Sequence, residues 1–354
     1  MAAGKKKNIR VISAAAAVAA LLLVLVFSGR NTADHRNYEC STYAMGTYFQ
    51  QSVTGNRAQA AAAEASRKIA ELENRISWKI PGSDLAHLQR EAGRGPVAIE
   101  RGTASLLSLA AEIAKQSDGF YDPTVQPLSS LWDFDGDLKK VPSPEAVSKA
   151  AGLVGYSGLA VDLSAGTASL SRSGMGIDLG GIGKGAACDT AVQAYRDAGV
   201  SSALISAGGS SIGLWGTKPD GTPWRIAVRD PATPDSNTDA MGELQLTSGY
   251  LSTSGIYEKC FRQNGVLYHH LLNPKTGYPQ NNGLVSVTVV ADGGALSDGL
   301  STACFVYGRE KSAALLDHYH AGAVFIDGRD RVCVTKNLAG KFKITNSKYH
   351  LAES

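Results

Sequence analysis

Closely spaced hairpin patterns are the feature of this sequence that most restricts its fold. Residues 159–163 and 168–171 are strand-like segments on either side of a turn at 164–167, and residues 323–335 form a second hairpin pattern. Many hairpins among a few separated helices favour an α+β fold with a largely antiparallel sheet over a doubly wound α/β fold. Single strands are expected at 47–53, 175–179, 204–206, 224–228, 244–246 and 285–290.

Several helices are expected to flank this sheet. The Ala-rich segment 57–76 carries apolar residues at helical spacing, and a second helix is predicted over 103–116, ended by Gly119 as a C-cap. Ser143 is placed to cap a helix over 144–151, and a fourth helix ends near Gly199. Because no internal repeat or low-complexity tract interrupts the pattern, we expect one folded domain over residues 41–354.

The N-terminus carries a membrane signal. Residues 11–27 are small or apolar and uncharged, and they follow a basic segment, residues 1–10. Their number, seventeen, lies between a signal-peptide core and the roughly 20 residues of a full span. The positive charge ahead of them predicts a cytoplasmic tail and export of the remaining chain. An uncleaved anchor is favoured over a cleaved signal, and a polar linker is expected over 28–40.

The charge balance argues against a nucleic-acid partner. The formal net charge is +3, but without the four Lys and Arg residues of the tail the chain has 31 basic and 32 acidic side chains.

The five cysteines are widely spaced and lack the pairing expected of zinc ligands. Cys188 and Cys304 lie in apolar segments, which favours buried thiols over a disulfide. Cys40 lacks the small, apolar lead-in of a lipid-modified cysteine.

A glycine-rich segment, residues 177–185, is the most informative candidate site. It is expected to end a strand, turn and open a helix, with Asp178, Gly181 and Lys184 along it. Glycines let a phosphate approach closely, the N–H groups of a helix start point at it, and a lysine adds a full charge. The spacing is neither that of a Walker A loop nor that of a GxGxxG dinucleotide motif. Close packing of a helix on a strand is the alternative explanation for these glycines.

Two further segments carry side chains suited to a metal or a phosphate. Asp298 and Thr302 stand four residues apart on an expected helix, so a carboxylate and a hydroxyl share one face. This oxygen pair suits Mg²⁺, although a helix cap and a structural threonine would give the same spacing. His269 and His270 alternate on an extended segment, so one of them is expected to point inward. An inward-pointing histidine could donate a hydrogen bond to a phosphate or transfer a proton. The alternative is a histidine that only packs in the core.

An aromatic loop follows the second predicted helix. Phe120 and Tyr121 precede Asp122, and Trp132 and Phe134 come soon after. Aromatic rings with a neighbouring carboxylate can stack on a planar ligand and accept its polar hydrogens. Core packing is the alternative, and it is the expected role of Trp132 and Phe134.

Together these segments resemble those of the ApbE family, the FAD:protein FMN transferases. The resemblance begins at Ala44 and reaches the last hairpin, and it rests on the order of segments that are each weak alone. The chain departs from the family pattern at Ser77-Trp78, where a Ser/Thr-Tyr pair is usual, and at Asn273, where an Asp is usual. The segments that carry it are residues 45–47, 120–127, 178–185, 208–209, 253–255, 270–279 and 298–302.

The resemblance implies a single ApbE-like flavin transferase domain over 41–354, with FAD as substrate and Mg²⁺ as metal. An acceptor hydroxyl would attack the FMN phosphorus while AMP leaves. Asp298 and His270 are the implied catalytic residues; Asp298 is the first choice to position or deprotonate the hydroxyl, and which of the two is the base stays open. Mg²⁺ would be held by the backbone carbonyl of Gly181, by Asp298 and by Thr302. FAD would lie across Met45, Phe120, Tyr121, Asp122, Asp178, Lys184 and His270.

The implied acceptor is a Ser or Thr hydroxyl of an exported flavoprotein with a Ser/Thr-Gly-Ala-Thr sequence, a subunit of a membrane electron-transport complex. The enzyme would then sit in the cytoplasmic membrane with its catalytic domain on the extracytoplasmic side. Two alternatives stay open. The same metal site could direct water at FAD and release FMN and AMP, or the protein could bind a flavin without catalysis.

Overall fold

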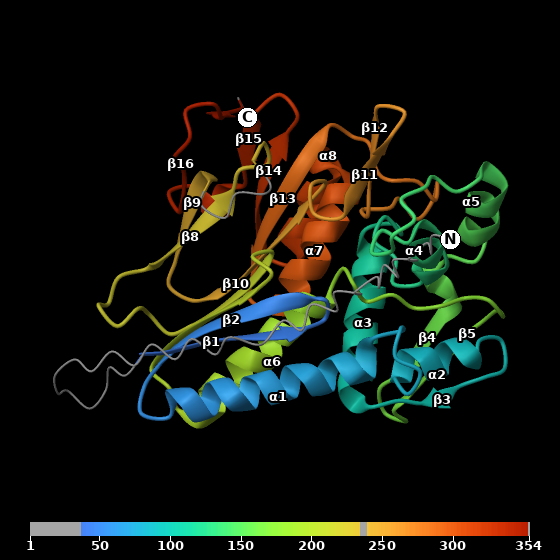
Figure 1. The fold of residues 1–354 in the computed structure, drawn as a ribbon, viewed down its shortest axis with the longest axis horizontal. Helices are drawn as coiled ribbons and strands as arrows, with labels where there is room; N and C mark the ends of the chain where they lie inside the picture. Colours follow the sequence, from blue (N-terminus) through green and yellow to red (C-terminus); the bar gives the residue numbers. More distant parts are fainter. Residues whose placement is uncertain (1–36, 234–238, 353–354) are drawn as a thin grey trace, which may run out of the picture.

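The computed structural model describes residues 37–233 and 239–352, and all structural statements concern these residues. The basic tail, the apolar segment 11–27 and residues 28–36 lie outside them, and so does the predicted anchor. Within the described residues, no helix combines the length and hydrophobicity that a membrane span requires. The α+β prediction is confirmed, because eight helices flank a largely antiparallel sheet in this part of the chain (Figure 1).

The helices and strands have well-defined bounds. The helices are α1 (Ala58–Ile76), α2 (Asp84–Arg90), α3 (Arg101–Gln116), α4 (Gln126–Trp132), α5 (Pro144–Ala151), α6 (Gly183–Ala198), α7 (Gly294–Tyr307) and α8 (Arg309–His318). The strands are β1 (Asn37–Ala44), β2 (Thr47–Thr54), β3 (Val97–Ala98), β4 (Leu159–Asp162), β5 (Thr167–Leu170), β6 (Ser202–Ala207), β7 (Ser211–Trp215), β8 (Trp224–Arg229), β9 (Ala240–Leu246), β10 (Gly249–Gly255), β11 (Cys260–Gln263), β12 (Val266–His269), β13 (Leu284–Ala291), β14 (Gly322–Asp327), β15 (Arg331–Val334), β16 (Phe342–Ile344) and β17 (His350–Leu351).

The main sheet has nine strands in the order β1-β2-β6-β7-β10-β13-β14-β15-β17. Every neighbouring pair is antiparallel except β15 with β17. The β1–β2 hairpin turns through Met45 and Gly46, which both have positive φ, as a two-residue hairpin loop requires. Strand β1 takes up residues 37–40, which we had expected in the linker.

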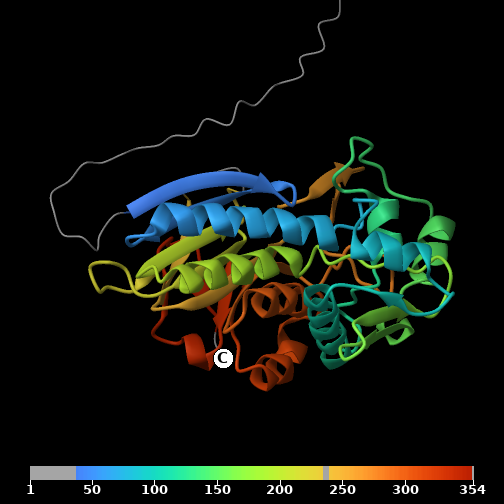
Figure 2. The same cartoon turned by 90° about the horizontal axis from the view of Figure 1, so that it is seen from below.

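Helices α1, α6 and α7 lie side by side across one face of this sheet (Figure 2). Helices α1 and α6 pack together through small residues, and Ala61, Ala65, Ala187 and Ala191 are all buried in one apolar cluster. Small side chains let two helices approach closely, and this packing fixes the position of α6 between α1 and α7.

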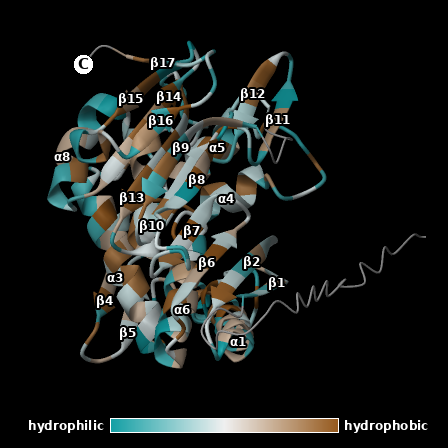
Figure 3. Ribbon diagram, turned by 90° about the vertical axis from the view of Figure 1, so that its left-hand side faces the viewer, coloured by the Kyte–Doolittle hydropathy of each residue, from teal (hydrophilic) through white to brown (hydrophobic). Residues whose placement is uncertain are grey.

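The opposite face is covered by a three-stranded sheet, β16-β9-β8. Leu244 and Ile226 of this small sheet pack with Leu251, Val324 and other apolar residues of the main sheet. Strands β13 and β14 are buried along most of their length, as expected for strands covered on both sides, and the brown colour of β14 in Figure 3 marks its apolar side chains.

One predicted strand is wrong. Residues 175–179 are extended and their odd-numbered side chains are buried, as the alternation indicated, but the only ladder contact is a single bridge between Gly176 and Val125. The neighbour of this segment is the loop before α4, and the Asp178 N–H donates to the Pro123 carbonyl at 2.8 Å. Alternating apolar residues indicate that one face of a segment is buried, and a loop can bury one face without pairing with a neighbouring strand.

Candidate active site

The site forms where the N-terminal ends of α6 and α7 meet. The Gly185 N–H donates to Asp298 Oδ2 at 2.9 Å, across 113 residues of sequence. A Cβ atom on Gly185 would lie 2.0 Å from the Gly294 carbonyl oxygen, so only glycine allows this approach. The glycines of residues 177–185 therefore serve close packing against α7 as well as opening a helix.

A carboxylate that sequence reasoning missed fixes the start of α7. Asp189 accepts hydrogen bonds from the N–H groups of Gly294 and Ala295, each at 2.7 Å. Burial raises its pKa, and these two hydrogen bonds act against that increase. The residue at the N-cap position of α7 is Gly293, which has no side chain to cap the helix, so the sequence signalled that a cap was needed but not which residue supplies it.

Asp298 lies in the first half of α7 and is only 3% exposed. The sequence also allowed Asp298 to be the N-cap of its helix, and this alternative is wrong, because the N-cap position of α7 is Gly293. Its Oδ2 accepts from Gly185, and its Oδ1 has no hydrogen bond within the described residues. One carboxylate oxygen is thus committed to the helix junction and the other is available to a ligand.

Gly181, Thr302 and Tyr121 meet beside Asp298. A Cβ on Gly181 would lie 3.2 Å from Thr302 Oγ1 and 3.3 Å from Tyr121 Cε2. Thr302 is held from the other side by Ser254 of β10, whose hydroxyl lies 3.2 Å from Thr302 Oγ1 and 2.8 Å from Ser301 Oγ. The structure therefore brings the three predicted metal ligands, Gly181, Asp298 and Thr302, to one place.

Tyr121 is buried, with 5% of its surface exposed, and its hydroxyl has no hydrogen-bond partner within the described residues. Burial is the largest cause that raises its pKa, followed by the negative charges of Asp298, Asp178 and Asp122. The phenol is therefore a neutral group surrounded by carboxylates.

His270 lies near enough to Lys184 for the lysine charge to act on its imidazole. Burial lowers the pKa of His270 to about 3, and the charges of Lys184 and Lys259 lower it further. Its Nδ1 is out of contact with solvent and has no partner within the described residues. His269, expected to alternate with it, bonds the Gln280 carbonyl through Nε2 at 3.1 Å and stacks edge-on against Phe305. His269 is thus the packing histidine and His270 the one near Lys184.

Three predicted flavin contacts, Asp122, Phe120 and Asp178, have side chains that contact other residues of the protein. Asp122 accepts from the N–H and hydroxyl of Thr124, at 2.8 and 2.6 Å, and from the Tyr156 N–H at 2.8 Å. The Phe120 ring packs on Tyr307, with Lys275 Nζ 4.2 Å from its centre. Met45 lies at the β1–β2 turn against the core. Asp178 accepts from the Gly180 N–H at 2.8 Å and is half-buried.

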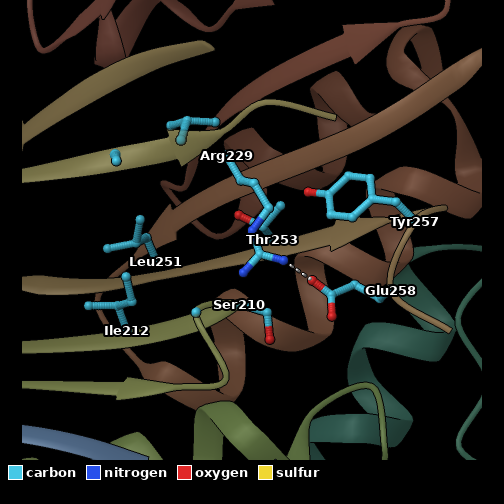
Figure 4. A pocket seen from close by; sticks show the side chains of 10 residues that line it. Ser210, Ile212, Arg229, Leu251, Thr253, Tyr257 and Glu258 are labelled. Carbon is cyan, nitrogen blue, oxygen red and sulfur yellow. Dashed lines mark hydrogen bonds and ion pairs between the residues drawn. The ribbon is translucent and has the colours of Figure 1, made fainter. Parts of the chain in front are cut away.

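Two hollows lie outside the junction of α6 and α7. A cleft of about 390 Å³, within the size range of ligand sites, lies between Trp78, Gln89, Arg90 and Met175, beside the segment that leads to Asp178. A second pocket, of about 10 Å³, has room for one water (Figure 4). There Arg229 pairs with Glu258 at 3.3 Å, next to Thr253, which points away from the α7 side of β10.

The donor set fits Mg²⁺. A carboxylate, a hydroxyl and a carbonyl are hard oxygen ligands, and Mg²⁺ is usually bound by one or two carboxylates together with waters and phosphate oxygens. Among the described residues no group of three or more His, Cys, Asp and Glu side chains is placed to bind a metal, so a site rich in nitrogen or sulfur ligands is not formed there. All five cysteines are free, and Cys188 and Cys304 are buried as expected.

Comparisons with known proteins agree on one family. Residues 45–326 match the ApbE family. The chain is 31% identical to the FAD:protein FMN transferase of Treponema pallidum over 336 residues, which is 89% of this chain and 91% of that protein. It is 30% identical to the Haemophilus influenzae FAD:protein FMN transferase over 257 residues, 72% of this chain and 74% of that protein.

Solved structures agree with this match. The ApbE protein of Thermotoga maritima superposes with a TM-score of 0.78 at 30% identity, covering 86% of this chain and 99% of that one. The flavin transferase ApbE of Vibrio cholerae gives a TM-score of 0.78 at 26% identity, covering 87% and 99%.

Proposed function

The chain belongs to the ApbE family and is a flavin transferase, and from this premise we propose a Mg²⁺-dependent transfer of FMN from FAD to a serine or threonine hydroxyl of another protein, with release of AMP. The observation that carries the proposal is the junction of α6 and α7, where Gly181, Thr302 and a buried phenol meet beside Asp298 and Lys184 lies in the first turn of α6. A lysine, a helix start and three oxygen ligands are the groups that a diphosphate and its cation need.

In the proposed reaction, the acceptor oxygen forms a bond to the FMN phosphorus, and the bond from that phosphorus to the oxygen of the AMP phosphate breaks. The electron pair of the broken bond leaves with AMP. Lys184, in the first turn of α6, would bind the nonbridging oxygens, where negative charge grows as the reaction proceeds.

Gly181, Asp298 and Thr302 would hold Mg²⁺ through a backbone carbonyl, a carboxylate and a hydroxyl. When bound, the ion supplies Lewis-acid stabilisation of the phosphate oxygens. The chain's own contribution is the rigid placement of these ligands, because Asp298 is tied to Gly185 and Thr302 to Ser254.

The proton of the acceptor hydroxyl would go to Asp298 or His270. His270 is neutral in the free enzyme, since burial and the Lys184 charge lower its pKa to about 3. A diphosphate bound at Lys184 would neutralise part of that charge and make the ring more basic, as a proton acceptor needs. We therefore favour His270 as the base and Asp298 as the metal ligand.

The acceptor and the location of the enzyme are proposed from the N-terminal sequence. Residues 1–27 carry a basic tail and an apolar segment typical of an exported or anchored protein. We accordingly place the catalytic domain on the extracytoplasmic side of the cytoplasmic membrane, acting on exported flavoproteins.

The test is a transfer assay with residues 28–354, since β1 begins at Asn37 and a start at residue 41 would cut it. The protein is incubated with FAD, Mg²⁺ and an acceptor domain carrying a Ser/Thr-Gly-Ala-Thr sequence. We expect the acceptor to gain the mass of FMN less one water, with one AMP released, and Asp298→Ala to abolish both. Free FMN without acceptor modification would identify a hydrolase instead, and no turnover of FAD at all would refute catalysis.

A further inference from the structure

The hydroxyl of Tyr121 is an unpaired polar group in the interior of the site. Only 5% of Tyr121 is exposed, and the hydroxyl has no partner within the described residues. An unpaired buried hydroxyl loses its hydrogen bonds to water and gains none in return. Another buried phenol in the same protein shows the usual arrangement, because the Tyr195 hydroxyl donates to Gln51 Oε1 at 2.7 Å.

No side chain of the described residues pairs with this hydroxyl. The nearby carboxylates of Asp122, Asp178 and Asp298 accept from backbone N–H groups, from Tyr156, Gly180 and Gly185 respectively. None of them can donate to the phenol, so its unused capacity is that of a donor. An acceptor oxygen on a bound ligand would satisfy this hydroxyl.

The position of the hydroxyl indicates what that acceptor is. The Tyr121 ring lies against Gly181, on the same side as Thr302 Oγ1, and Lys184 follows within one helical turn of Gly181. A lysine in the first turn of a helix and the positive end of the helix dipole attract an anion, and anion oxygens accept hydrogen bonds strongly.

We propose that the Tyr121 hydroxyl donates a hydrogen bond to an oxygen of the substrate's diphosphate and thereby selects flavins that carry a diphosphate. This inference rests on the proposed function for the identity of the ligand as FAD. In the free protein the hydroxyl is kept unpaired, at a cost in stability, and it is paired when the diphosphate binds.

The experiment compares Tyr121→Phe with the unaltered protein, in the presence of Mg²⁺. Affinities for FAD, ADP and riboflavin are measured by calorimetry, because ADP has the diphosphate without the flavin and riboflavin the flavin without phosphates. We expect FAD and ADP binding to weaken about 10- to 100-fold, as for loss of a hydrogen bond to a charged group. Riboflavin binding should not change, and the Tm of the ligand-free variant should equal or exceed that of the unaltered protein.

Tyr195→Phe is the matched control, since it removes a buried hydroxyl that has a partner and lies outside the site. It should lower the Tm and leave FAD affinity unchanged, the opposite pattern. Unchanged FAD and ADP affinities in Tyr121→Phe, an equal loss for riboflavin, or a lowered Tm would each overturn the assignment. If the unaltered protein binds FAD and ADP but modifies no acceptor, the transferase proposal fails while the Tyr121 result still stands.

Discussion

Gly185→Ala tests whether the contact between α6 and α7 places the catalytic groups. The added Cβ would lie 2.0 Å from the Gly294 carbonyl oxygen, 2.4 Å from its carbon and 2.7 Å from Asp298 Cβ. Two of these atoms are backbone, so no side-chain rotation relieves the collision and the helices must separate by about 1 Å to reach an acceptable contact. Overpacking of this kind costs about 1–3 kcal/mol, and stretching the Gly185–Asp298 hydrogen bond adds to it.

The expected result is a fall of about 2–4 kcal/mol in the free energy of unfolding, seen as a Tm lower by several degrees, about 3–8 °C. A 1 Å displacement of catalytic groups costs about 100-fold in rate, so FMN transfer in a single-turnover assay should fall by that order. Gly102→Ala is the control, because Gly102 is also helical and a Cβ there meets nothing within 4 Å. It should keep full activity and equal or higher stability. Unaltered stability and transfer rate in Gly185→Ala would refute the reasoning.

Two further predictions concern stability. The pKa of His270 is lowered to about 3 in the folded protein, from an ordinary value of 6.5, so its contribution is present above pH 6.5 and is lost as the pH falls toward 3. His270→Asn should therefore lose stability less steeply below pH 6.5 in urea unfolding, by up to ~1.4 kcal/mol per pH unit, and parallel curves for the two proteins would contradict this. Trp132 is 1% exposed and donates from Nε1 to the Gly277 carbonyl at 2.8 Å. Trp132→Phe should cost about 1–3 kcal/mol and Trp132→Ala about 3–5 kcal/mol in the same assay, and equal costs would show that the ring itself contributes little.

Elements with local signals were predicted nearly to their ends. The helix over 144–151 matches α5, because Ser143 caps it by accepting from the Ala146 N–H at 3.2 Å, a contact that lies within four residues. The hairpin pattern at 159–171 matches β4 and β5 for the same reason. Such features are determined by neighbours in sequence, so the sequence is enough to place them.

One strand with buried polar side chains, β10, escaped prediction. Strand β10 was identified only as a Thr-Ser-Gly motif, because Ser252 and Ser254 break its apolar pattern. Their hydroxyls pair with Ser297 and Ser301 of α7, at 2.9 and 2.8 Å. A hydroxyl that is hydrogen-bonded can be buried as readily as an apolar group. Here the partner is 45 residues away in the sequence, so the local sequence does not reveal it.

In the candidate site too, the contacts that were predicted are those between residues close in sequence. The i, i+4 spacing of Asp298 and Thr302 predicted their shared face correctly, since the two residues lie on α7. Asp122 was expected to face a ligand, yet Thr124 and Tyr156 occupy its carboxylate. Asp189 was missed because its contact with Gly294 spans 105 residues. The prediction that a flavin binds came from family resemblance, whereas the predictions of a bound anion and a bound cation came from the local sequence alone.

Asp189 also explains why an anion would bind at α6 and not at α7. Both helices begin at the junction, and each start offers N–H groups and the positive end of a helix dipole. The carboxylate of Asp189 already fills the start of α7, at 2.7 Å from two N–H groups. In the first turn of α6, Asp298 accepts from one N–H group, that of Gly185, and Lys184 adds positive charge. The two helix starts are therefore electrostatically unequal, and the inequality directs a diphosphate to the side where Tyr121 and the free oxygen of Asp298 lie.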